Sequence, residues 1–186
     1  MALSAGECVY ADELPYDTYT YTYWEDIAIT PAAYVPNGSV SGLSVGTTDF
    51  AEPQDLCVAP DGLVYVADTK NNRIVVLSAD MTELVRIIDG FDRDGSEDTF
   101  NAPYGVCVSE NNQLYVADSN NKRIVVMTPE GEFVKIIDNP QSEILEDGFD
   151  FVPLKVTVDY ADRVYVIAKN AFEGILVFES TGDFTG

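Results

Sequence analysis

An internal repeat with a fixed spacing of 50 residues constrains the fold of this 186-residue chain more than any other feature. Residues 53–77 and 103–127 are identical at twelve of 25 positions, and a weaker third copy covers residues 153–178. In the first copy the identical positions are Pro53, Cys57, Val58, Tyr65, Val66, Ala67, Asp68, Asn71, Arg73, Ile74, Val75 and Val76. A repeat of about 20–50 residues is typical of solenoids and propellers, in which each copy forms one structural unit.

Each copy divides into short apolar runs that are separated by turn residues. The runs of the first copy are LCVA, LVYVAD, RIVVL and LVRII. Gly62 lies between the first two runs, and Asn111-Asn112 takes its place in the second copy. These residue types tolerate the positive φ of tight hairpins. Four short strands in each unit of this length indicate a blade of a β-propeller.

We therefore expect an all-β fold of about three four-stranded propeller blades that follow an extended, tyrosine-rich segment. A β-sandwich is the alternative, but it would not require twelve identities at one fixed offset. The expected organisation is a signal-peptide remnant at residues 1–11, an extended segment at 12–49 and propeller blades at 50–186, divided at about 50–99, 100–149 and 150–186.

The repeated unit P-x-G-h-x-V-x-x-x-x-x-h-Y-V-A-D-x-x-N-x-R-I-x-V resembles the NHL repeat. The second copy matches this pattern closely, whereas the first copy has Asp55 in place of the glycine. The third copy lacks the acid and the arginine, with Ala168 and Gly174 near their positions. The resemblance covers about three-quarters of the chain and implies a propeller, a fold that typically has about 4–8 blades.

The segment before the repeats is similar to the lead-in of extracytoplasmic NHL proteins of Gram-positive gut bacteria. In that group a membrane domain often follows the propeller. Residues 9–13, VYADE, resemble a signal-peptidase site, so we expect a secreted or cell-surface protein. Three blades form an open arc, which leads us to expect a partial propeller that is completed by further blades. Covering by the tyrosine-rich segment and self-association of two chains are the alternatives.

Charge and composition exclude several classes of function. The chain has 10 Lys and Arg against 32 Asp and Glu, a formal net charge of −22, and no histidine. A chain this acidic gains no counterion release from a polyanion, which argues against a nucleic-acid partner. The absence of histidine removes His-based nucleophile pairs and His-ligated zinc. No apolar stretch approaches the roughly 18 residues of a membrane span.

The paired acid and arginine of each repeat indicate a structural role. Asp68 with Arg73, and Asp118 with Arg123, bracket the loop between the second and third strands. A carboxylate and a guanidinium so placed can form a charge-assisted pair that holds the loop. A ring of ligand-facing carboxylates is the functional alternative, but both partners disappear together in the third copy.

Two repeat cysteines lie within apolar runs. Cys57 and Cys107 are therefore expected to be buried thiols that pack as small hydrophobes. A disulfide between them is not expected, because it requires Cα atoms within about 7 Å.

Both linkers between copies are acidic, and the first has alternating oxygen ligands. Asp92, Asp94, Ser96 and Asp98 resemble part of a calcium loop. The glycine at the sixth position and the glutamate at the twelfth are missing. A solvated loop between blades is therefore the alternative, and calcium is the only cofactor that we consider.

Aromatic and hydroxyl residues alternate before the repeats. Tyr19, Tyr21 and Tyr23 alternate with threonines and are followed by Trp24. This period of two predicts a strand with one aromatic face. Such a face can stack on sugar rings, or it can pack against an exposed sheet.

The residues that follow the repeat prolines are our candidate ligand-binding residues. Gln54, Tyr104 and Lys155 differ between copies while their neighbours repeat, and Asp55 lies beside them. The starts of inner strands line the mouth of a propeller channel, where propellers commonly bind ligands. Core positions must fill similar space in every blade, whereas mouth positions need not.

We expect a non-enzymatic binding or scaffold module that presents an acidic face to a protein, peptide or carbohydrate. A calcium-dependent lactonase or a lyase is the alternative that the family resemblance implies, and a structural spacer of a membrane protein is another. The lyase alternative is weakened by the absence of histidine, and no Walker loop, GxSxG or CxxC motif is present.

Overall fold

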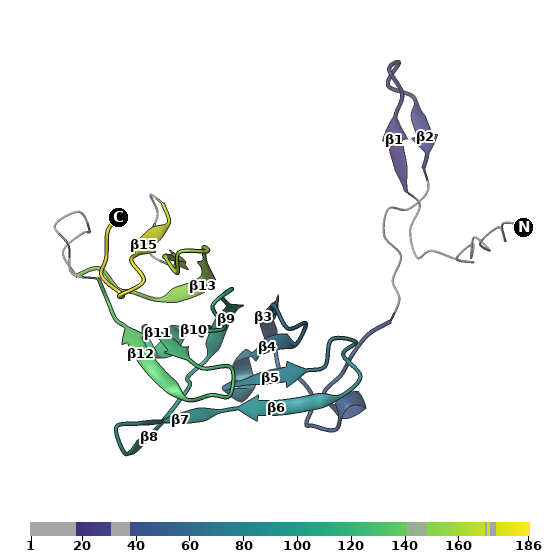
Figure 1. Ribbon diagram of the computed structural model, residues 1–186. Helices are drawn as coiled ribbons and strands as arrows, with labels where there is room; N and C mark the ends of the chain where they lie inside the picture. The colour runs from purple at the N-terminus through teal and green to yellow at the C-terminus, as the bar shows by residue number, and fades with distance from the viewer. Residues whose placement is uncertain are drawn as a thin grey trace, which may run out of the picture. The chain divides into compact units, whose positions relative to one another are not determined.

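The computed structural model divides the chain into two units, residues 1–39 and residues 40–186 (Figure 1). It describes residues 18–30, 38–140, 142, 145, 148–169, 171 and 174–186. The expected signal-peptide remnant at residues 1–11 lies outside the described residues. The second unit begins at Val40, ten residues before the first expected blade, because Val45 is buried against the first sheet.

The three repeat copies form three separate antiparallel sheets, which we call blades 1, 2 and 3. Blade 1 contains β3 (Pro53–Val58), β4 (Val64–Asp68), β5 (Arg73–Leu77) and β6 (Leu84–Ile88). Blade 2 contains β9 (Pro103–Val108), β10 (Leu114–Asp118), β11 (Arg123–Met127) and β12 (Phe133–Ile137). Blade 3 contains β13 (Pro153–Val158), β14 (Val164–Ala168) and β15 (Leu176–Phe178).

This arrangement confirms the all-β, propeller-type fold, with one difference in blade 3. Its described sheet has three strands instead of the expected four. Only Phe184 continues the pattern, through an isolated antiparallel bridge to Phe178. The third repeat copy was also the weakest in sequence.

One turn residue closes the first hairpin of every blade in the same way, and Gly62 and Asn112 were the two that the sequence predicted. Gly62, Asn112 and Asp162 have φ values of 89°, 62° and 58°. Each donates its backbone N–H to the carbonyl three residues earlier, over 2.8, 2.9 and 3.0 Å. Glycine adopts this left-handed conformation readily, and asparagine and aspartate tolerate it better than most residues.

Apolar residues on alternating positions pack each blade against the next. We call the face of a blade that looks back along the chain its leading face, and the opposite one its trailing face. The trailing face of blade 1 and the leading face of blade 2 share one buried cluster, and blades 2 and 3 share a second. Full burial of each large aliphatic side chain contributes about 1.5–3 kcal/mol before entropic costs. The blades are therefore held together mainly by these two inter-blade cores.

Short 3₁₀ turns complete the connections inside the blades. They are η1 (Leu43–Val45), η2 (Thr69–Asn71) and η3 (Ser119–Asn121). None of the helical segments in the described part of the chain is long and apolar enough to span a membrane.

The acidic linker between blades 1 and 2 is a β-hairpin, which differs from the solvated loop considered above. Strands β7 (Gly90–Arg93) and β8 (Ser96–Thr99) are joined by Asp94-Gly95, with φ values of 54° and 85°. Two consecutive residues at positive φ are the signature of a tight hairpin turn, for which Asp-Gly is a preferred pair. Phe91 anchors the hairpin, because its ring is buried and stacks on Phe133 of β12 with centroids 5.5 Å apart. The hairpin thus lies against the outermost strand of blade 2.

Residues 18–30 form a second hairpin in the first unit. Strands β1 (Tyr19–Tyr21) and β2 (Ile27–Ile29) pair Tyr19 with Ile29 and Tyr21 with Ile27. The aromatic strand is therefore confirmed for the first two tyrosines, whose rings meet edge-on at 5.8 Å. Tyr23 instead lies in the turn, because the chain reverses direction there.

Candidate functional site

The first strands of the three blades lie side by side and form a common wall (Figure 1). A first strand has one edge without a neighbour in its own sheet, so some of its N–H groups need partners elsewhere. Side chains of the preceding blade supply them. The Val106 N–H donates to Asp55 Oδ2 over 2.9 Å, and the Val108 N–H donates to Cys57 Sγ over 3.4 Å. This wall corresponds to the inner edge of the propeller, where the sequence predicted a channel.

Equivalent positions of the three inner strands hold Asp55, Gly105 and Lys155. Asp55 forms an ion pair with Lys155, although the two belong to blades 1 and 3. Asp55 Oδ1 also accepts the Leu56 N–H over 2.9 Å, so this carboxylate is held from several sides. Its side chain is 10% exposed and that of Lys155 is 48% exposed. The pair therefore has one fixed partner and one partner that reaches solvent.

Gly105 allows the inner strands of blades 2 and 3 to approach each other. A Cβ atom at this position would lie 2.7 Å from the Leu154 carbonyl oxygen and 3.0 Å from the Lys155 Cα. Because both of these are backbone atoms, a side chain could fit only if a strand moved. The glycine of the repeat therefore has a packing reason in blade 2. The first copy accommodates Asp55 at the same position.

The strand register corrects one of the candidate positions. Asp55 lies opposite Ala67, and Lys155 lies opposite Ile167, so these two residues are equivalent. The residue directly after each proline falls in a register shift, and in blade 3 that residue is Leu154. Gln54 and Tyr104 therefore have Leu154 as their counterpart, and not the predicted Lys155. The sequence agrees with this register, because Leu154 directly follows Pro153, as Gln54 follows Pro53 and Tyr104 follows Pro103.

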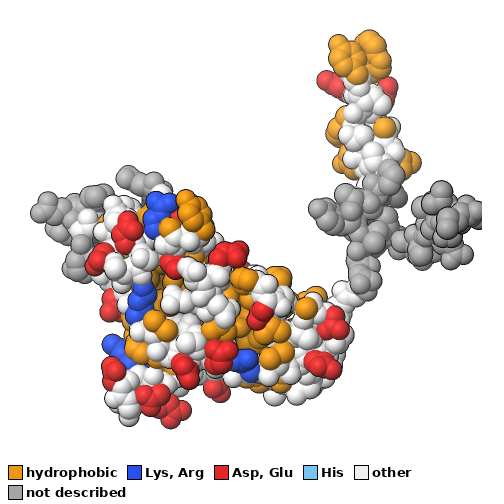
Figure 2. Space-filling view, in the orientation of Figure 1, with side chains coloured by type: hydrophobic (Ala, Val, Ile, Leu, Met, Phe, Trp, Pro, Cys, Tyr) orange, Lys and Arg blue, Asp and Glu red, His pale blue; other side chains and the backbone are white. Residues whose placement is uncertain are grey.

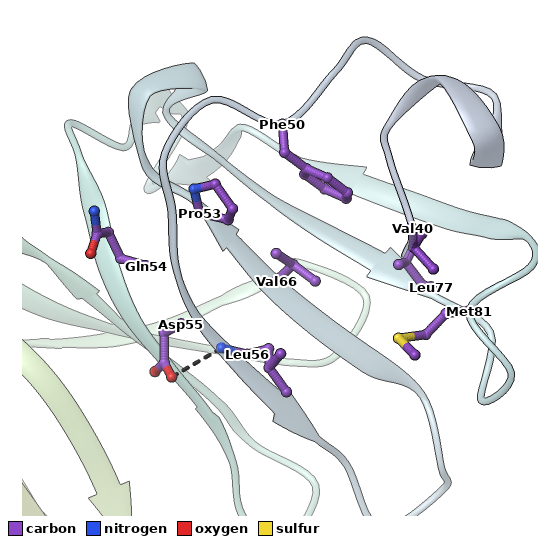
Figure 3. Close-up of a pocket in the computed structure, with 9 residues that line it drawn as sticks. All are labelled: Val40, Phe50, Pro53, Gln54, Asp55, Leu56, Val66, Leu77 and Met81. Atoms are coloured by element: carbon purple, nitrogen blue, oxygen red, sulfur yellow. Dashed lines mark hydrogen bonds between the residues drawn. The ribbon is translucent and has the colours of Figure 1, made fainter. Parts of the chain in front are cut away.

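The predicted mouth residues differ in their accessibility. Gln54 is exposed and Tyr104 is half-buried, while Asp55 and Lys155 are joined by the ion pair. Figure 3 shows Gln54 and Asp55 turned to one side of β3, with Leu56 on the other. The structure thus brings Asp55 and Lys155 together and leaves Gln54 exposed to solvent.

The sequence analysis missed an apolar hollow on the leading face of blade 1. This cavity of about 430 Å³ is bordered mainly by hydrophobic side chains (Figure 3). Its lining residues are Val40, Phe50, Pro53, Gln54, Asp55, Leu56, Val66, Leu77 and Met81. Phe50, Leu56, Val66 and Leu77 have apolar counterparts in the core between blades 1 and 2. The sequence therefore carries no signal that separates this surface from the core.

The two repeat thiols are half-buried, and not buried as expected. Both are free; Cys57 packs against the core between blades 1 and 2, whereas Cys107 packs against the core between blades 2 and 3. Their side chains therefore point the same way around the arc, which is unfavourable for a disulfide. A hydrogen bond with Cys107 lowers the pKa of Cys57 to about 6, and the same contact, together with burial, raises the pKa of Cys107.

Both acid–arginine pairs of the repeats hold loops, as expected. Arg73 Nε donates to Asp68 Oδ2 over 2.7 Å, and Arg123 Nε donates to Asp118 Oδ2 over 2.8 Å. The other oxygen of each acid accepts a backbone N–H from the segment that leads into the same blade, over 2.7 Å. Burial raises the pKa of Asp118 despite these bonds. Each pair therefore ties the loop before a blade to the interior of that blade.

The four residues of the calcium hypothesis do not form a common set of ligands. Asp98 is held by Arg123, whose two terminal nitrogens donate to its oxygens over 2.7 and 2.9 Å, and this bonding lowers the pKa of Asp98. Asp92 accepts the Gly95 N–H over 2.8 Å within the turn. Among the described residues, no group of three or more acidic or cysteine side chains is placed to hold a metal ion.

Comparison with known proteins agrees with this architecture. The model of the NHL repeat family matches residues 50–77 and 100–127, which are the first two repeat copies. No curated protein matches the chain. Hydrazine synthase of Kuenenia stuttgartiensis has a similar structure, with a TM-score of 0.56 and 13% identity over 82% of this chain and 38% of that one.

A second similar structure is a catalytically inactive, histidine-to-alanine variant of virginiamycin B lyase from Staphylococcus aureus with quinupristin. Its TM-score is 0.51 and its identity is 17%, over 91% of this chain and 47% of that one. The present chain therefore spans less than half the length of either structure. At these identities the similarity defines the fold alone.

These findings place the chain among the β-propellers, as an arc of three blades. The matched repeats make the assignment narrower, because the first two blades are built from NHL repeats. This fold is one that serves as a binding or scaffold module.

Proposed function

We propose that the chain is a non-enzymatic binding module that holds a protein or peptide ligand at the mouth of its channel wall. The observation that carries this proposal is the difference between equivalent positions of the inner strands. Within a repeated framework, Gln54, Tyr104 and Leu154 differ in size and polarity, as do Asp55 and Lys155. Framework positions must satisfy the same packing, so the variable side chains are the ones free to match a ligand.

The charge of the chain favours a cationic ligand. The net charge of −22 attracts positively charged partners over distances comparable to the Debye length, about 8 Å at physiological ionic strength. The predicted acidic face is not concentrated at the mouth, since the acids of the β7–β8 hairpin lie beside the outermost strand of blade 2. We therefore assign them to attraction at long range, and we assign direct contact to the mouth residues.

Binding is favoured over catalysis by the residue types that are present. Replacing one histidine with alanine accompanies the loss of catalysis in the lyase variant, and the present chain has no histidine. We do not extend the lyase or hydrazine synthase activity to this chain. An extracytoplasmic location remains part of the proposal, and its support is the sequence near residue 11 together with the family resemblance.

The experiment is a calorimetric binding screen of the full chain against basic, neutral and acidic peptides and against oligosaccharides. We expect a basic peptide to bind, with an affinity that falls as salt increases. Tyr104→Ala should weaken binding about tenfold or more, the effect of losing about 1.4 kcal/mol at an aromatic contact. Tyr160→Ala is the matched control, because this tyrosine is 84% exposed in a hairpin turn at the far end of its strand. Equal losses from both variants, or no binding by any peptide, would contradict the proposal.

A further inference from the structure

The first and last faces of the arc both carry exposed apolar side chains. Val45 and Phe50 cover the outer part of the first face, where Val75 and Leu77 are buried. On the leading face of blade 1, Leu56 and Val58 are 60% and 62% exposed. On the trailing face of blade 3, Ile167 and Ile175 are 49% and 55% exposed. Figure 2 shows hydrophobic side chains at the surface over the first blade, among acidic ones.

The same positions are buried wherever two blades meet. Val106 and Val108 of blade 2, the counterparts of Leu56 and Val58, are 1% and 7% exposed. The counterparts of the exposed blade 3 residues are equally buried, as the register shows. They are Ala117 and Ile124 of blade 2, both 0% exposed. Within the chain, a leading face therefore packs against a trailing face. The leading face of blade 1 and the trailing face of blade 3 each lack such a partner in the described part of the chain.

From these observations we propose that a second copy of this chain covers both faces. The leading face of each copy packs on the trailing face of the other, which gives two identical contacts around one twofold axis. A head-to-tail contact that closes after two copies forms a ring, whereas one that does not close would form a filament.

A hydrogen-bond donor at the same position of each blade supports the same pairing. In the two contacts within the chain, Thr69 and Ser119 donate their hydroxyls to the carbonyls of Pro103 and Pro153 in the following blade. The equivalent residue of blade 3 is Lys169, which is exposed. In the pairing its amine would meet the Pro53 carbonyl of the second copy, beside the acidic Glu52. Lys169 thus supplies a hydrogen-bond donor at this end of the arc, and Glu52, which pairs with Lys70 of its own copy, lies at the other end.

The test is the mass of the full chain in solution, measured by light scattering and sedimentation over a range of concentrations. We expect a dimer. Val58→Asp and Ile167→Asp should each shift it to a monomer, weakening association at least about tenfold for a buried, unpaired charge. Val134→Asp is the matched control, since Val134 is 43% exposed on the outer strand of blade 2 and belongs to neither face. Circular dichroism would show that each variant is folded.

Mixing the two disruptive variants distinguishes this pairing from others. Each variant keeps one intact face, so the mixture should form a heterodimer through one of the two contacts. Pairing of two leading faces predicts instead that Ile167→Asp has no effect, which would overturn the proposal. A monomer at all concentrations, or a filament, would also overturn it. A dimer that is lost in Trp24→Ser, a change in the β1–β2 hairpin, would assign the association to that hairpin and reject ring closure.

Discussion

Blades 1 and 2 have nearly the same sequence pattern but different surroundings, and their leading faces show what this difference does. Val58 and Val108 are identical residues at equivalent positions, yet the first is 62% exposed and the second is 7% exposed. In blade 2 the preceding blade covers this face. In blade 1 Val45 and Phe50 cover the outer part of this face. The residue type is therefore a consequence of the repeat, while its burial depends on the neighbour.

Among differences between blades 1 and 2, we expect the largest effect on stability from the ion pairs Asp68–Arg73 and Asp118–Arg123, which hold the loops. Arg123→Met should lower the free energy of unfolding by about 3–5 kcal/mol, because it leaves Asp118 buried without its arginine and also removes the closer of the two arginines that pair with Asp98. Arg73→Met should cost about 1 kcal/mol less, since the remaining bonds of Arg73 go to Thr47 and Thr48 and to no second carboxylate. Urea unfolding of both variants measures the difference. If Arg73→Met lowered the free energy of unfolding more than Arg123→Met, the contact between Asp98 and Arg123 would not stabilise the fold.

The valine pair tests the role of the neighbouring blade directly. Val108→Ala should lower the free energy of unfolding by about 2 kcal/mol, because a buried side chain is lost. Val58→Ala should cost less than about 0.5 kcal/mol in the monomer, as expected for an exposed position. The measurement is urea unfolding at a low protein concentration, where a dimer would dissociate. Equal losses would mean that the leading face of blade 1 is covered in the monomer as well.

Two equivalent tyrosines, Tyr65 in blade 1 and Tyr115 in blade 2, differ by one hydrogen bond. The Tyr115 hydroxyl donates to Gln113 Oε1 over 3.1 Å, whereas the buried Tyr65 hydroxyl has no partner among the described residues, because Leu63 replaces the glutamine. Tyr115→Phe should cost about 1 kcal/mol, and Tyr65→Phe should be neutral or stabilising. Thermal unfolding of the two variants gives the sign. A clear loss in Tyr65→Phe would indicate a water or another partner at that hydroxyl.

The two thiols offer the smallest effect, which concerns reactivity. With a pKa of about 6, Cys57 is mainly a thiolate at pH 7, while Cys107, whose pKa is raised, is a thiol. Iodoacetamide at pH 7 should therefore modify Cys57 first, with half of its maximal rate near pH 6. Peptide mass spectrometry in a Cys8→Ser background locates the label. Faster labelling of Cys107 would reverse the assignment of the hydrogen bond between them.

Much of the fold could be predicted because the same pattern of apolar and turn residues occurs in more than one copy of the repeat. The alternating apolar residues, the turn residues at Gly62 and Asn112, and the two ion pairs all lie where the sequence indicated. The β7–β8 hairpin was not predicted, although Asp94-Gly95 is a favourable turn pair, because its neighbours are mostly acidic. The bulge after the repeat prolines was not predicted either, since a bulge leaves the residue count of a strand almost unchanged.

The sequence alone determined that this chain forms repeated antiparallel sheets with two apolar faces, because strand periodicity and turn chemistry are local properties. Only the tertiary structure decided which of those faces are covered, that Asp55 meets Lys155 across 100 residues, and that Asp98 binds Arg123. These outcomes depend on which blades are neighbours and how closely their inner strands approach. Contacts between distant parts of a chain are set by packing in three dimensions, and no local pattern records them.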